Sequence, residues 1–387
     1  MFDFDELIDR RSTLSYKWAI PEGELPMWIA DMDIRSPEPV RRAIAEVAEE
    51  GIYGYSVTPK ELFASVADYF KRRHGATLSP SDMLYSNGAI AGVAACVRAL
   101  SREGDKVLVQ APVYNNFYSV IEKCRRISVS SDLLFDGEKY SIDFDDLEAK
   151  LSDESVRLMI VCNPHNPVGR IWTPGELARI AELAAKHGVK VISDEVHCDF
   201  VNPGLHYTPF YMASELAASI SCTIVSGSKT FNMAGLQTGF VIAKNEEIRR
   251  RVSDRLDMDE LSEPNVFASR ALIAAYTECD EWIDALADYV YTNRLAACKY
   301  IKENCPELKP ISAASTYLLW VDVSAVEADA DVFVKRLREL TGLYVSAGSA
   351  YGESGRGFVR INLATQRSRV IDGMERLARG VKAMMEE

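Results

Sequence analysis

Residues 221–232, Ser-Cys-Thr-Ile-Val-Ser-Gly-Ser-Lys-Thr-Phe-Asn, place a lysine just beyond the end of an apolar run. Ligands of α/β proteins bind beyond the carboxyl ends of the strands, where Lys229 would then lie. A lysine that is neutral there can attack an aldehyde, and the hydroxyls of Ser226 and Ser228 can hydrogen-bond a phosphate. Taken alone, such a lysine is more often a solvated surface residue, so the surrounding sequence has to decide.

Outward from this stretch, short apolar runs alternate with amphipathic helical stretches, which is typical of an α/β fold. The runs are rich in Val and Ile and do not alternate with polar residues, as expected for a parallel sheet covered on both faces. We expect strands at 106–110, 126–130, 156–162, 189–193, 222–226 and 239–243. Thr173-Pro174 and Gly188 bracket one helix as N-cap, first turn and end, and Ser36-Pro37 and Gly51 bracket an earlier one similarly.

The C-terminal part has a different pattern. Residues 316–323 and 357–363 are strand-like, and a final amphipathic helix carries apolar residues on one face, namely Val370, Met374, Leu377 and Val381. No internal repeat or Gly/Ser linker separates this part from the rest. We therefore expect a second, smaller α+β domain that packs closely against the first.

The composition limits the partners. The chain has 387 residues and a formal charge of -13, which disfavours nucleic acids and anionic membrane surfaces. No signal peptide and no apolar stretch of membrane-spanning length is visible, so we expect a cytoplasmic protein. The eight cysteines show no C-x-x-C pair and no His-spaced zinc pattern, which indicates reduced thiols and no bound metal.

Two further polar motifs follow expected strands. Asp194 comes directly after the strand at 189–193, and a buried carboxylate there needs a cation such as a protonated pyridine nitrogen. A helix cap or a magnesium ligand is the alternative for this residue. Asn166 lies in the turn-rich stretch 162–169 and could donate a hydrogen bond to a phenolate oxygen, although a plain turn explains the same residues.

Three weaker signals complete the set. The small residues Gly88, Ala89 and Ile90 open a helical stretch whose first amides could bind phosphate. Tyr114 could stack on a planar ring, although a core position is more common for an aromatic residue. Arg360 lies in an apolar strand and suits a substrate α-carboxylate, with a structural salt bridge as the alternative.

In this order, these elements resemble the fold-type I enzymes that depend on pyridoxal 5′-phosphate (PLP), over nearly the whole chain. The resemblance implies an aspartate-aminotransferase-like fold, with a large domain at 46–284 around a mostly parallel seven-stranded sheet. The small α+β domain would combine 1–45 with 285–387. It also implies that Lys229 forms the Schiff base and shuttles protons, and that Asp194 pairs with the pyridine nitrogen.

The other roles come from the same resemblance. Asn166 contacts the ring oxygen and the substrate, Tyr114 stacks on the ring and belongs to the catalytic group, and Arg360 takes the substrate carboxylate. The phosphate would be met by Gly88, Ala89, Ile90, Ser226 and Ser228.

Within these enzymes, the opening is similar to that of the MalY/PatB-type cystathionine β-lyases. The shared stretches are Lys17-Trp18, Pro26 to Asp33, Tyr53-Gly54-Tyr55 and Ser228 to Asn232. By this resemblance Tyr55 reaches the cofactor phosphate of a neighbouring subunit, which implies a homodimer with shared active sites. Ala30 would line the substrate carboxylate pocket.

Two positions depart from the ordinary aminotransferase pattern. His197 stands three residues after Asp194, where aminotransferases commonly have Tyr and the lyase branch has His as a cofactor residue. Gln237 stands eight residues after Lys229, where a phosphate-binding Arg is common. Both departures favour the lyase branch.

The resemblance therefore implies α,β-elimination of L-cystathionine or a related cysteine S-conjugate to pyruvate, ammonia and a thiol such as homocysteine. An aminotransferase acting on an L-amino acid is the enzymatic alternative, because the carbanion chemistry is shared. A PLP-bound protein that binds a transcription regulator is the second alternative.

Overall fold

The computed structural model describes residues 2–386 and has an α/β fold with a seven-stranded main sheet. The strand order across this sheet is β2 (Met83–Ser86), β10 (Gly239–Ile242), β9 (Ser221–Val225), β8 (Lys190–Asp194), β7 (Val156–Cys162), β3 (Lys106–Val109) and β4 (Ile127–Ser130). β10 runs antiparallel to both of its neighbours, and the remaining pairs are parallel. The predicted aspartate-aminotransferase-like fold, with its mostly parallel sheet, is confirmed.

The six expected strands are all present, and none of their ends differs from the predicted one by more than one residue. β2 was missed by the sequence analysis. It has only four residues, Met-Leu-Tyr-Ser, and lies at the sheet edge, where only β10 pairs with it. A short edge strand carries little of the apolar signal of a strand buried on both faces.

The main sheet is covered by helices on both faces, as its apolar strands require. In β7, Leu158 and Ile160 belong to a core with α3 (Ala89–Leu100), α4 (Asn116–Lys123) and α9 (Glu246–Met258). The alternating residues Met159 and Val161 pack on the other face with α5 (Phe144–Leu151), α6 (Pro174–Lys186) and α7 (Glu215–Ile220). A further core gathers α2 (Lys60–His74), α10 (Ala268–Glu278) and Phe231, the residue after α8 (Gly227–Thr230).

The two helix starts predicted from Ser/Thr-Pro pairs differ in detail. Thr173 caps α6 as predicted, and Glu176 completes a capping box with it. The earlier helix, α1 (Glu38–Glu50), ends at Gly51 as predicted, but Pro37 occupies its N-cap position and no side chain caps it. Ser36 is therefore not the cap. Its hydroxyl instead donates to the carbonyl of Asn232, at 2.9 Å.

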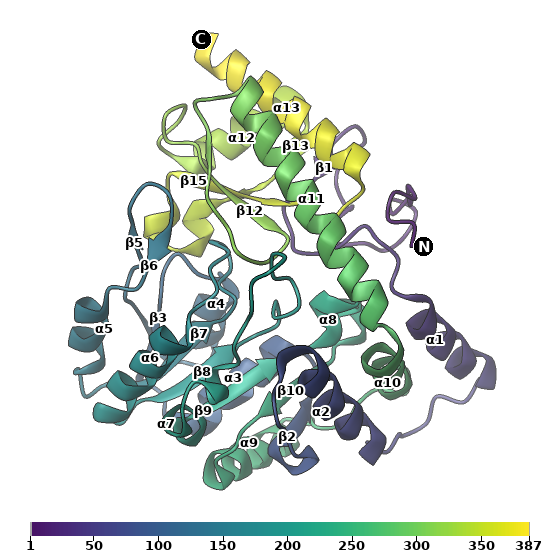
Figure 1. Ribbon diagram of the computed structural model, residues 1–387, viewed down its shortest axis with the longest axis vertical. Helices are drawn as coiled ribbons and strands as arrows, with labels where there is room; N and C mark the ends of the chain where they lie inside the picture. Colours follow the sequence, from purple (N-terminus) through teal and green to yellow (C-terminus); the bar gives the residue numbers. More distant parts are fainter. Residues whose placement is uncertain (1, 387) are drawn as a thin grey trace.

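A smaller body stands on the main one and is drawn at the top of Figure 1. Its sheet has the order β11 (Lys309–Pro310), β12 (Leu318–Asp322), β15 (Phe358–Asn362) and β14 (Ser346–Ala347). It packs on α12 (Ala330–Thr341), α13 (Arg367–Glu386) and the long α11 (Asp280–Asn304). The predicted face of the final helix is buried in this core: Val370, Met374, Leu377 and Val381.

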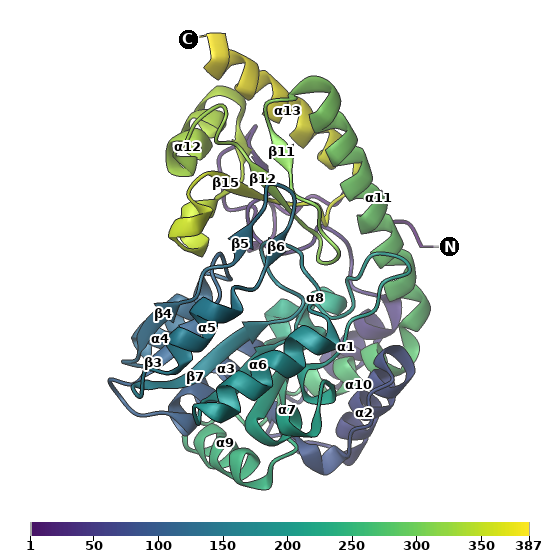
Figure 2. The ribbon, with the colours of Figure 1, turned by 60° about the vertical axis from the view of Figure 1, so that its left-hand side comes forward.

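The N-terminal segment joins the two bodies. β1 (Leu25–Pro26) pairs with β13 (Leu343–Tyr344) of the smaller body, and the chain then continues to α1 on the larger one. The hairpin of β5 (Leu134–Phe135) and β6 (Tyr140–Ser141) extends from the larger body toward the smaller one in Figure 2. The active-site candidates lie where these segments meet.

Two more expectations concern the whole chain. The eight cysteines are all free, as their spacing predicted. Within residues 2–386, no helix combines the length and the apolar character that crossing a membrane requires.

Candidate active site

A cavity of about 1290 Å³ opens at the carboxyl ends of the central strands. The ends of β7, β8 and β9 are level, because Cys162 pairs with Asp194 and Asp194 pairs with Ile224. The loops after these strands therefore meet at one edge, as α/β ligand sites do. Most of the predicted site residues line this cavity: Ala30, Gly88, Ala89, Ile90, Tyr114, Asn166, Asp194, His197, Ser228, Lys229 and Arg360.

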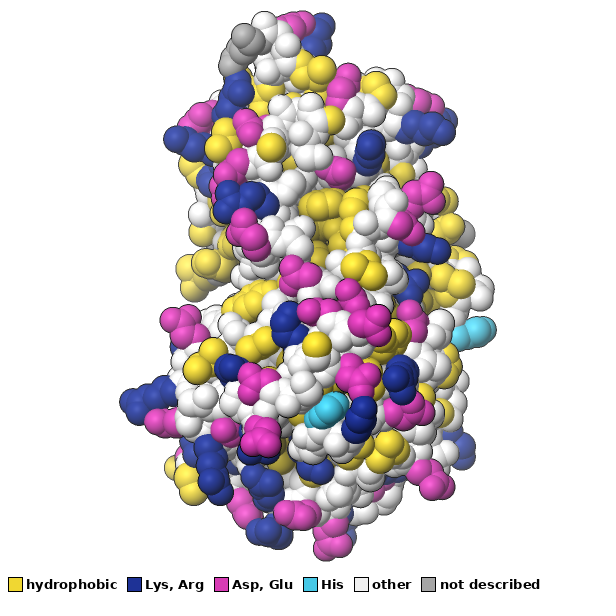
Figure 3. Space-filling view, turned by 90° about the vertical axis from the view of Figure 1, so that its left-hand side faces the viewer, with side chains coloured by type: hydrophobic (Ala, Val, Ile, Leu, Met, Phe, Trp, Pro, Cys, Tyr) yellow, Lys and Arg dark blue, Asp and Glu magenta, His cyan; other side chains and the backbone are white. Residues whose placement is uncertain are grey.

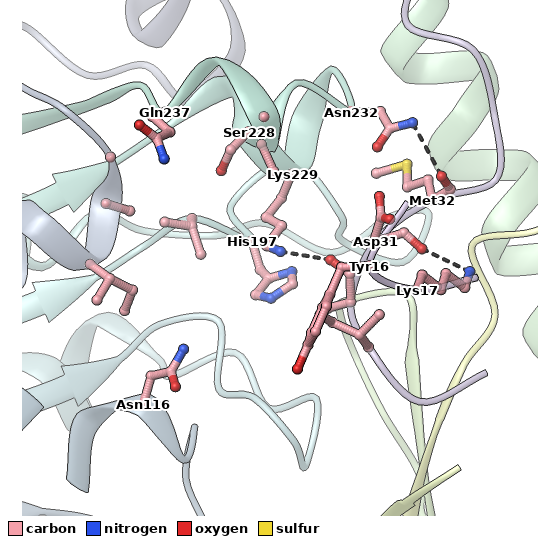
Figure 4. Close-up of a pocket in the computed structure, with 18 of the residues that line it drawn as sticks. Tyr16, Lys17, Asp31, Met32, Asn116, His197, Ser228, Lys229, Asn232 and Gln237 are labelled. Carbon is pink, nitrogen blue, oxygen red and sulfur yellow. Dashed lines mark hydrogen bonds between the residues drawn. The ribbon is translucent and has the colours of Figure 1, made fainter. Parts of the chain in front are cut away.

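Lys229 extends from the short helix α8 into the middle of the cavity (Figure 4). Its Nζ donates a hydrogen bond to the carbonyl oxygen of Ala30, at 2.6 Å. Burial lowers the pKa of Lys229 to about 8. The negative charge of Asp31 opposes this shift, and the positive charge of Arg360 adds to it. An appreciable fraction of this amine is therefore neutral near pH 7, which a nucleophile or a base requires.

Asp194 is a buried carboxylate with almost no partner. Within the described chain, its side chain accepts one hydrogen bond, from the backbone N–H of Val196 at 3.3 Å. Burial raises the pKa of Asp194 to about 6, although this hydrogen bond and the charge of Lys229 oppose the shift. A carboxylate left in this state needs a cationic partner from a ligand.

Its neighbour Glu195 points the other way and is fully engaged. Glu195 Oε1 accepts from Ser193 Oγ at 2.6 Å and from the Phe210 N–H at 2.8 Å, and Tyr207 donates to Oε2. The acidic pair thus divides into one structural carboxylate and one that faces the cavity.

His197 and Tyr114 form part of the cavity wall near Asp194. Burial, together with the charges of Lys229 and Arg360, lowers the pKa of His197 to about 3, so its imidazole is neutral. Its Nδ1 is buried and lacks a partner among the described residues. Tyr114 is half-buried, and its hydroxyl accepts from Asn116 Nδ2 at 2.7 Å. Burial and the charge of Asp194 raise the pKa of Tyr114, which keeps this phenol protonated.

Arg360 and Asn166 are in contact in the cavity. Arg360 Nη1 donates to Asn166 Oδ1 at 3.2 Å, and Nη2 donates to the carbonyl of Trp28 at 2.9 Å. Its Nε has no partner in the described part of the chain, and no carboxylate is paired with this guanidinium there. The structural salt bridge considered for Arg360 is thus absent, which leaves the side chain able to bind an anion.

A phosphate-sized anion would find its donors at the start of α3 and in α8. No side chain caps α3, and Gly88, Ala89 and Ile90 at its start face the cavity. Ser228 and Gln237 lie at the same end of the cavity in Figure 4. Ser226 does not line the cavity. Its hydroxyl donates to the Thr238 carbonyl at 2.6 Å and accepts from Ser228 N, so it caps α8.

A buried carboxylate, that of Asp199, holds the helix that carries Lys229. Thr230 Oγ1 donates to Asp199 Oδ2 at 2.7 Å, and the same carboxylate is bound by His74 at 3.1 Å and Arg73 at 3.4 Å. His74, Cys198 and Asp199 are close enough together to resemble a metal site. The adjacent Arg73 guanidinium already neutralises the carboxylate, which disfavours a cation there.

The N-terminal segment supplies residues that the sequence analysis assigned no role. Asp31 lines the cavity directly after Ala30. Asn362 Nδ2 donates to the carbonyls of Ile29 and Asp31, at 2.7 and 2.8 Å, and holds the segment on β15. Strand alternation could have revealed Asn362, because it shares a face with Arg360 two residues earlier. Asp31 could have been singled out as a charged residue within the stretch Pro26 to Asp33, which is shared with the cystathionine β-lyases.

Tyr55 lies outside the cavity of its own chain. Its side chain is fully exposed, as are large parts of Ile52, Tyr53 and Val57 around it. Its predicted contact with a neighbouring subunit concerns a partner chain, and stays a prediction here.

The sequence also matches a known protein family. Residues 31–377 match the family model of class I and II aminotransferases. The chain therefore belongs to the class I and II aminotransferase family.

Individual relatives narrow this further. The chain is 37% identical over 382 residues to the cystathionine β-lyase PatB of Bacillus subtilis, covering 97% of this chain and 98% of the relative. It is 32% identical to the protein MalY of Escherichia coli, covering 99% and 100%. The predicted resemblance to the MalY/PatB branch is confirmed.

Solved structures give the same result. Cystalysin from Treponema denticola, which contains pyridoxal 5′-phosphate, superposes with a TM-score of 0.95 at 29% identity, covering 99% of both chains. The PLP-bound C–S lyase from Staphylococcus hominis gives 0.92 at 30% identity, covering 98% of this chain and 99% of that one.

Proposed function

We propose that this protein is a PLP-dependent C–S β-lyase that cleaves L-cystathionine or related cysteine S-conjugates by α,β-elimination. With water, L-cystathionine yields pyruvate, ammonia and homocysteine. The observation that carries the proposal is the meeting of Lys229, Asp194 and Arg360 in one cavity, in a chain similar to PatB and to C–S lyases over nearly its whole length.

The residues present fit the cofactor. Asp194 lacks a cation and would hold the pyridine nitrogen protonated, while Nδ1 of His197 lacks a partner near the same place. The amides of Gly88 to Ile90, with Ser228, would bind the phosphate, and Tyr114 and Asn166 would contact the ring. Bound in this way, PLP supplies the electron sink that makes the Cα proton of an amino acid acidic.

The protein's own groups then orient the substrate and move its proton. The guanidinium of Arg360 would bind the substrate carboxylate beside Asn166, which fixes Cα with respect to Lys229. Nζ of Lys229 removes the Cα proton and holds it while the thiolate leaves from Cβ. The Ala30 carbonyl accepts a hydrogen bond from this nitrogen in the present structure, so the amine has a fixed acceptor.

An assay without a second substrate tests the proposal. The purified protein with PLP is incubated with L-cystathionine and no oxo-acid, and pyruvate and free thiol are measured. Equal amounts of both products are expected. Turnover that requires an oxo-acid acceptor would instead identify an aminotransferase. A panel of thioether amino acids then ranks the substrates.

We further propose a homodimer in which Tyr55 reaches the phosphate site of the neighbouring subunit. The exposed apolar residues Ile52, Tyr53 and Val57 beside Tyr55 support a covered surface there. Light scattering tests the dimer. Tyr55→Phe should weaken PLP binding without changing the molecular mass, and an unchanged dissociation constant would contradict the shared site.

The remaining predictions have their own tests. We propose that 46–284 and the pair 1–45 and 285–387 form the two domains, which limited proteolysis can test. On the face drawn in Figure 3, Lys and Arg are interspersed with Asp and Glu, which supports the prediction of no nucleic-acid partner. A cytoplasmic location is tested by cell fractionation, and a transcription-regulator partner by co-purification with wild type and Lys229→Ala.

A further inference from the structure

Asp31 lines the cavity and is held in place by hydrogen bonds to both its side chain and its backbone. Its Oδ2 accepts from Arg10 Nη2 at 2.8 Å. Its carbonyl accepts from Lys17 Nζ at 2.9 Å and from Asn362 Nδ2 at 2.8 Å. The carboxylate keeps 27% of its side-chain surface exposed and lines the cavity, so Arg10 leaves part of it open.

The same short segment provides the acceptor of Lys229. Ala30, the residue before Asp31, accepts from Lys229 Nζ at 2.6 Å and from the Tyr317 hydroxyl at 3.3 Å. Figure 4 shows Asp31 beside this hydrogen bond and on the side away from the main sheet. The backbone contacts of Asp31 thus fix both its own carboxylate and the carbonyl that holds the amine.

The charged groups around the Lys229 amine differ in whether the cofactor would also engage them. The groups around Lys229 are Asp31 from the N-terminal segment, Asp194 at the end of β8, the neutral His197 after it, Arg360 from β15 and the phenol of Tyr317. The phenol of Tyr114 also lines the cavity. In the proposed function, Asp194 is engaged by the pyridine nitrogen of the cofactor. Asp31 is then the carboxylate that remains for the amine.

We propose that Asp31 is a positioning residue for Lys229, whose carboxylate stabilises the protonated amine against the Ala30 carbonyl after the amine has taken the substrate proton. In that step, the Cα–H bond breaks, an N–H bond forms at Nζ, and the electron pair stays on the substrate. The inference rests on the proposed role of Lys229 as the base. It adds that a residue of the N-terminal segment influences the charge of this base.

The expected size follows from the usual effect of a neighbouring opposite charge. A carboxylate within about 4–6 Å of a cation shifts its pKa by about 1–3 units. Asp31 is partly exposed and shares its charge with Arg10, so the lower end of this range applies. We expect Asp31→Asn to lower the pKa of Lys229 by about one unit, because the neutral amide no longer favours the ammonium form.

The pKa is measurable without turnover. The full-length chain, freed of cofactor, is pulse-labelled with acetic anhydride over a range of pH, and the acetylation of Lys229 is quantified by mass spectrometry. In the holoenzyme, the pH at which the visible absorption titrates should move in the same direction. Both readings report the charge at Nζ and are independent of elimination.

Matched variants separate charge from structure. Asp9→Asn removes the same charge from an exposed position in the same segment and should leave the Lys229 pKa unchanged. Asp31→Glu keeps the charge and should keep the pKa near its wild-type value. Asp31→Ser replaces the Asn variant if that variant does not fold.

The outcomes are distinct. A Lys229 pKa that is the same in Asp31→Asn and Asp9→Asn overturns the inference, as does a fall in Asp31→Glu as large as in Asp31→Asn. A fall confined to the neutral variants at position 31 supports it. If the wild type forms no pyruvate from L-cystathionine, the proposed function fails, while the labelling result still decides the role of Asp31.

Discussion

The two walls of the cavity differ in how far their polar groups are satisfied. The sheet wall consists of Asp194, His197 and Lys229, and the N-terminal wall consists of residues 28–33 with the side chains of Arg360 and Asn362. On the sheet wall, Asp194 accepts one long hydrogen bond and His197 Nδ1 has no partner among the described residues. On the N-terminal wall, Asn362 makes two hydrogen bonds, and Lys17 and Arg10 bind Asp33. Arg360 Nε is the exception there, since it has no partner among the described residues.

This difference indicates that the sheet wall binds a ligand, whereas the N-terminal wall mainly supports the site. Buried polar groups in native proteins are normally hydrogen-bonded, so those that are not indicate a missing ligand. The sheet wall is therefore where the cofactor would be held. The N-terminal wall is pre-formed and presents one carbonyl, one carboxylate and one guanidinium at fixed places. Substitutions in the two walls should consequently have different effects.

The largest effect on the sheet wall is expected for Lys229→Ala. Loss of the base should reduce pyruvate formation from L-cystathionine by roughly 10²–10⁴-fold. Lys186→Ala, at an exposed salt bridge with Glu148, serves as the control and should retain full activity. Comparable activity of the two variants would show that Lys229 does not act on the proton.

On the N-terminal wall, Lys17→Met should mainly affect stability. Burial raises the pKa of Asp33, but the charge and hydrogen bond of Lys17 outweigh it and keep this carboxylate ionised. Removing one partner of a buried pair costs about 3–5 kcal/mol of unfolding free energy, and we expect the lower end because Arg10 still pairs with Asp33. Urea denaturation measures this loss. Arg35→Met, in an exposed pair with Glu6, should change little, and equal losses would contradict a supporting wall.

Arg360→Lys should weaken substrate binding while leaving the fold intact. The planar guanidinium of Arg360 donates to Asn166 and to the Trp28 carbonyl and still has donors for a carboxylate. The ammonium of a lysine cannot make this set of hydrogen bonds. Losing a hydrogen bond to a charged group corresponds to roughly a 10–100-fold higher KM for L-cystathionine. Arg356→Lys, in an exposed pair with Glu353, is the control. An unchanged KM in Arg360→Lys would place the carboxylate elsewhere.

The smallest effect, and one of opposite sign, is expected for Asp194→Asn in the cofactor-free protein. The folded pKa of about 6 exceeds the ordinary value of 3.8, so the folded state binds the extra proton and wild-type stability falls as pH rises from about 4 to about 6. The amide removes this penalty, so the variant should melt about 2–6 °C higher at pH 8. The difference should disappear near pH 4. A lower melting temperature at pH 8 would show that Asp194 is already paired.

Sequence patterns predicted the sheet wall well because its residues follow strongly apolar strands. β7 is buried on both faces and six of its seven residues are apolar, so its apolar signal was visible, and Asn166 follows it within a few residues. The level ends of β7, β8 and β9 then bring separate motifs together. The N-terminal wall had no such local signal. Asp31 lies 198 positions from Lys229 in the sequence, and only the path of the chain between the two bodies brings them together.

The sequence alone determined the chemical groups of this site and the positions along the chain of the strands that carry them, because both depend on residue type and local periodicity. The tertiary structure decided which of these groups are free. Asp194 and Glu195 are adjacent in the sequence, yet Glu195 is saturated by Ser193, Tyr207 and the Phe210 N–H while Asp194 faces the cavity. Pairing and burial are set by long-range contacts, and these contacts set the charge that each carboxylate can hold.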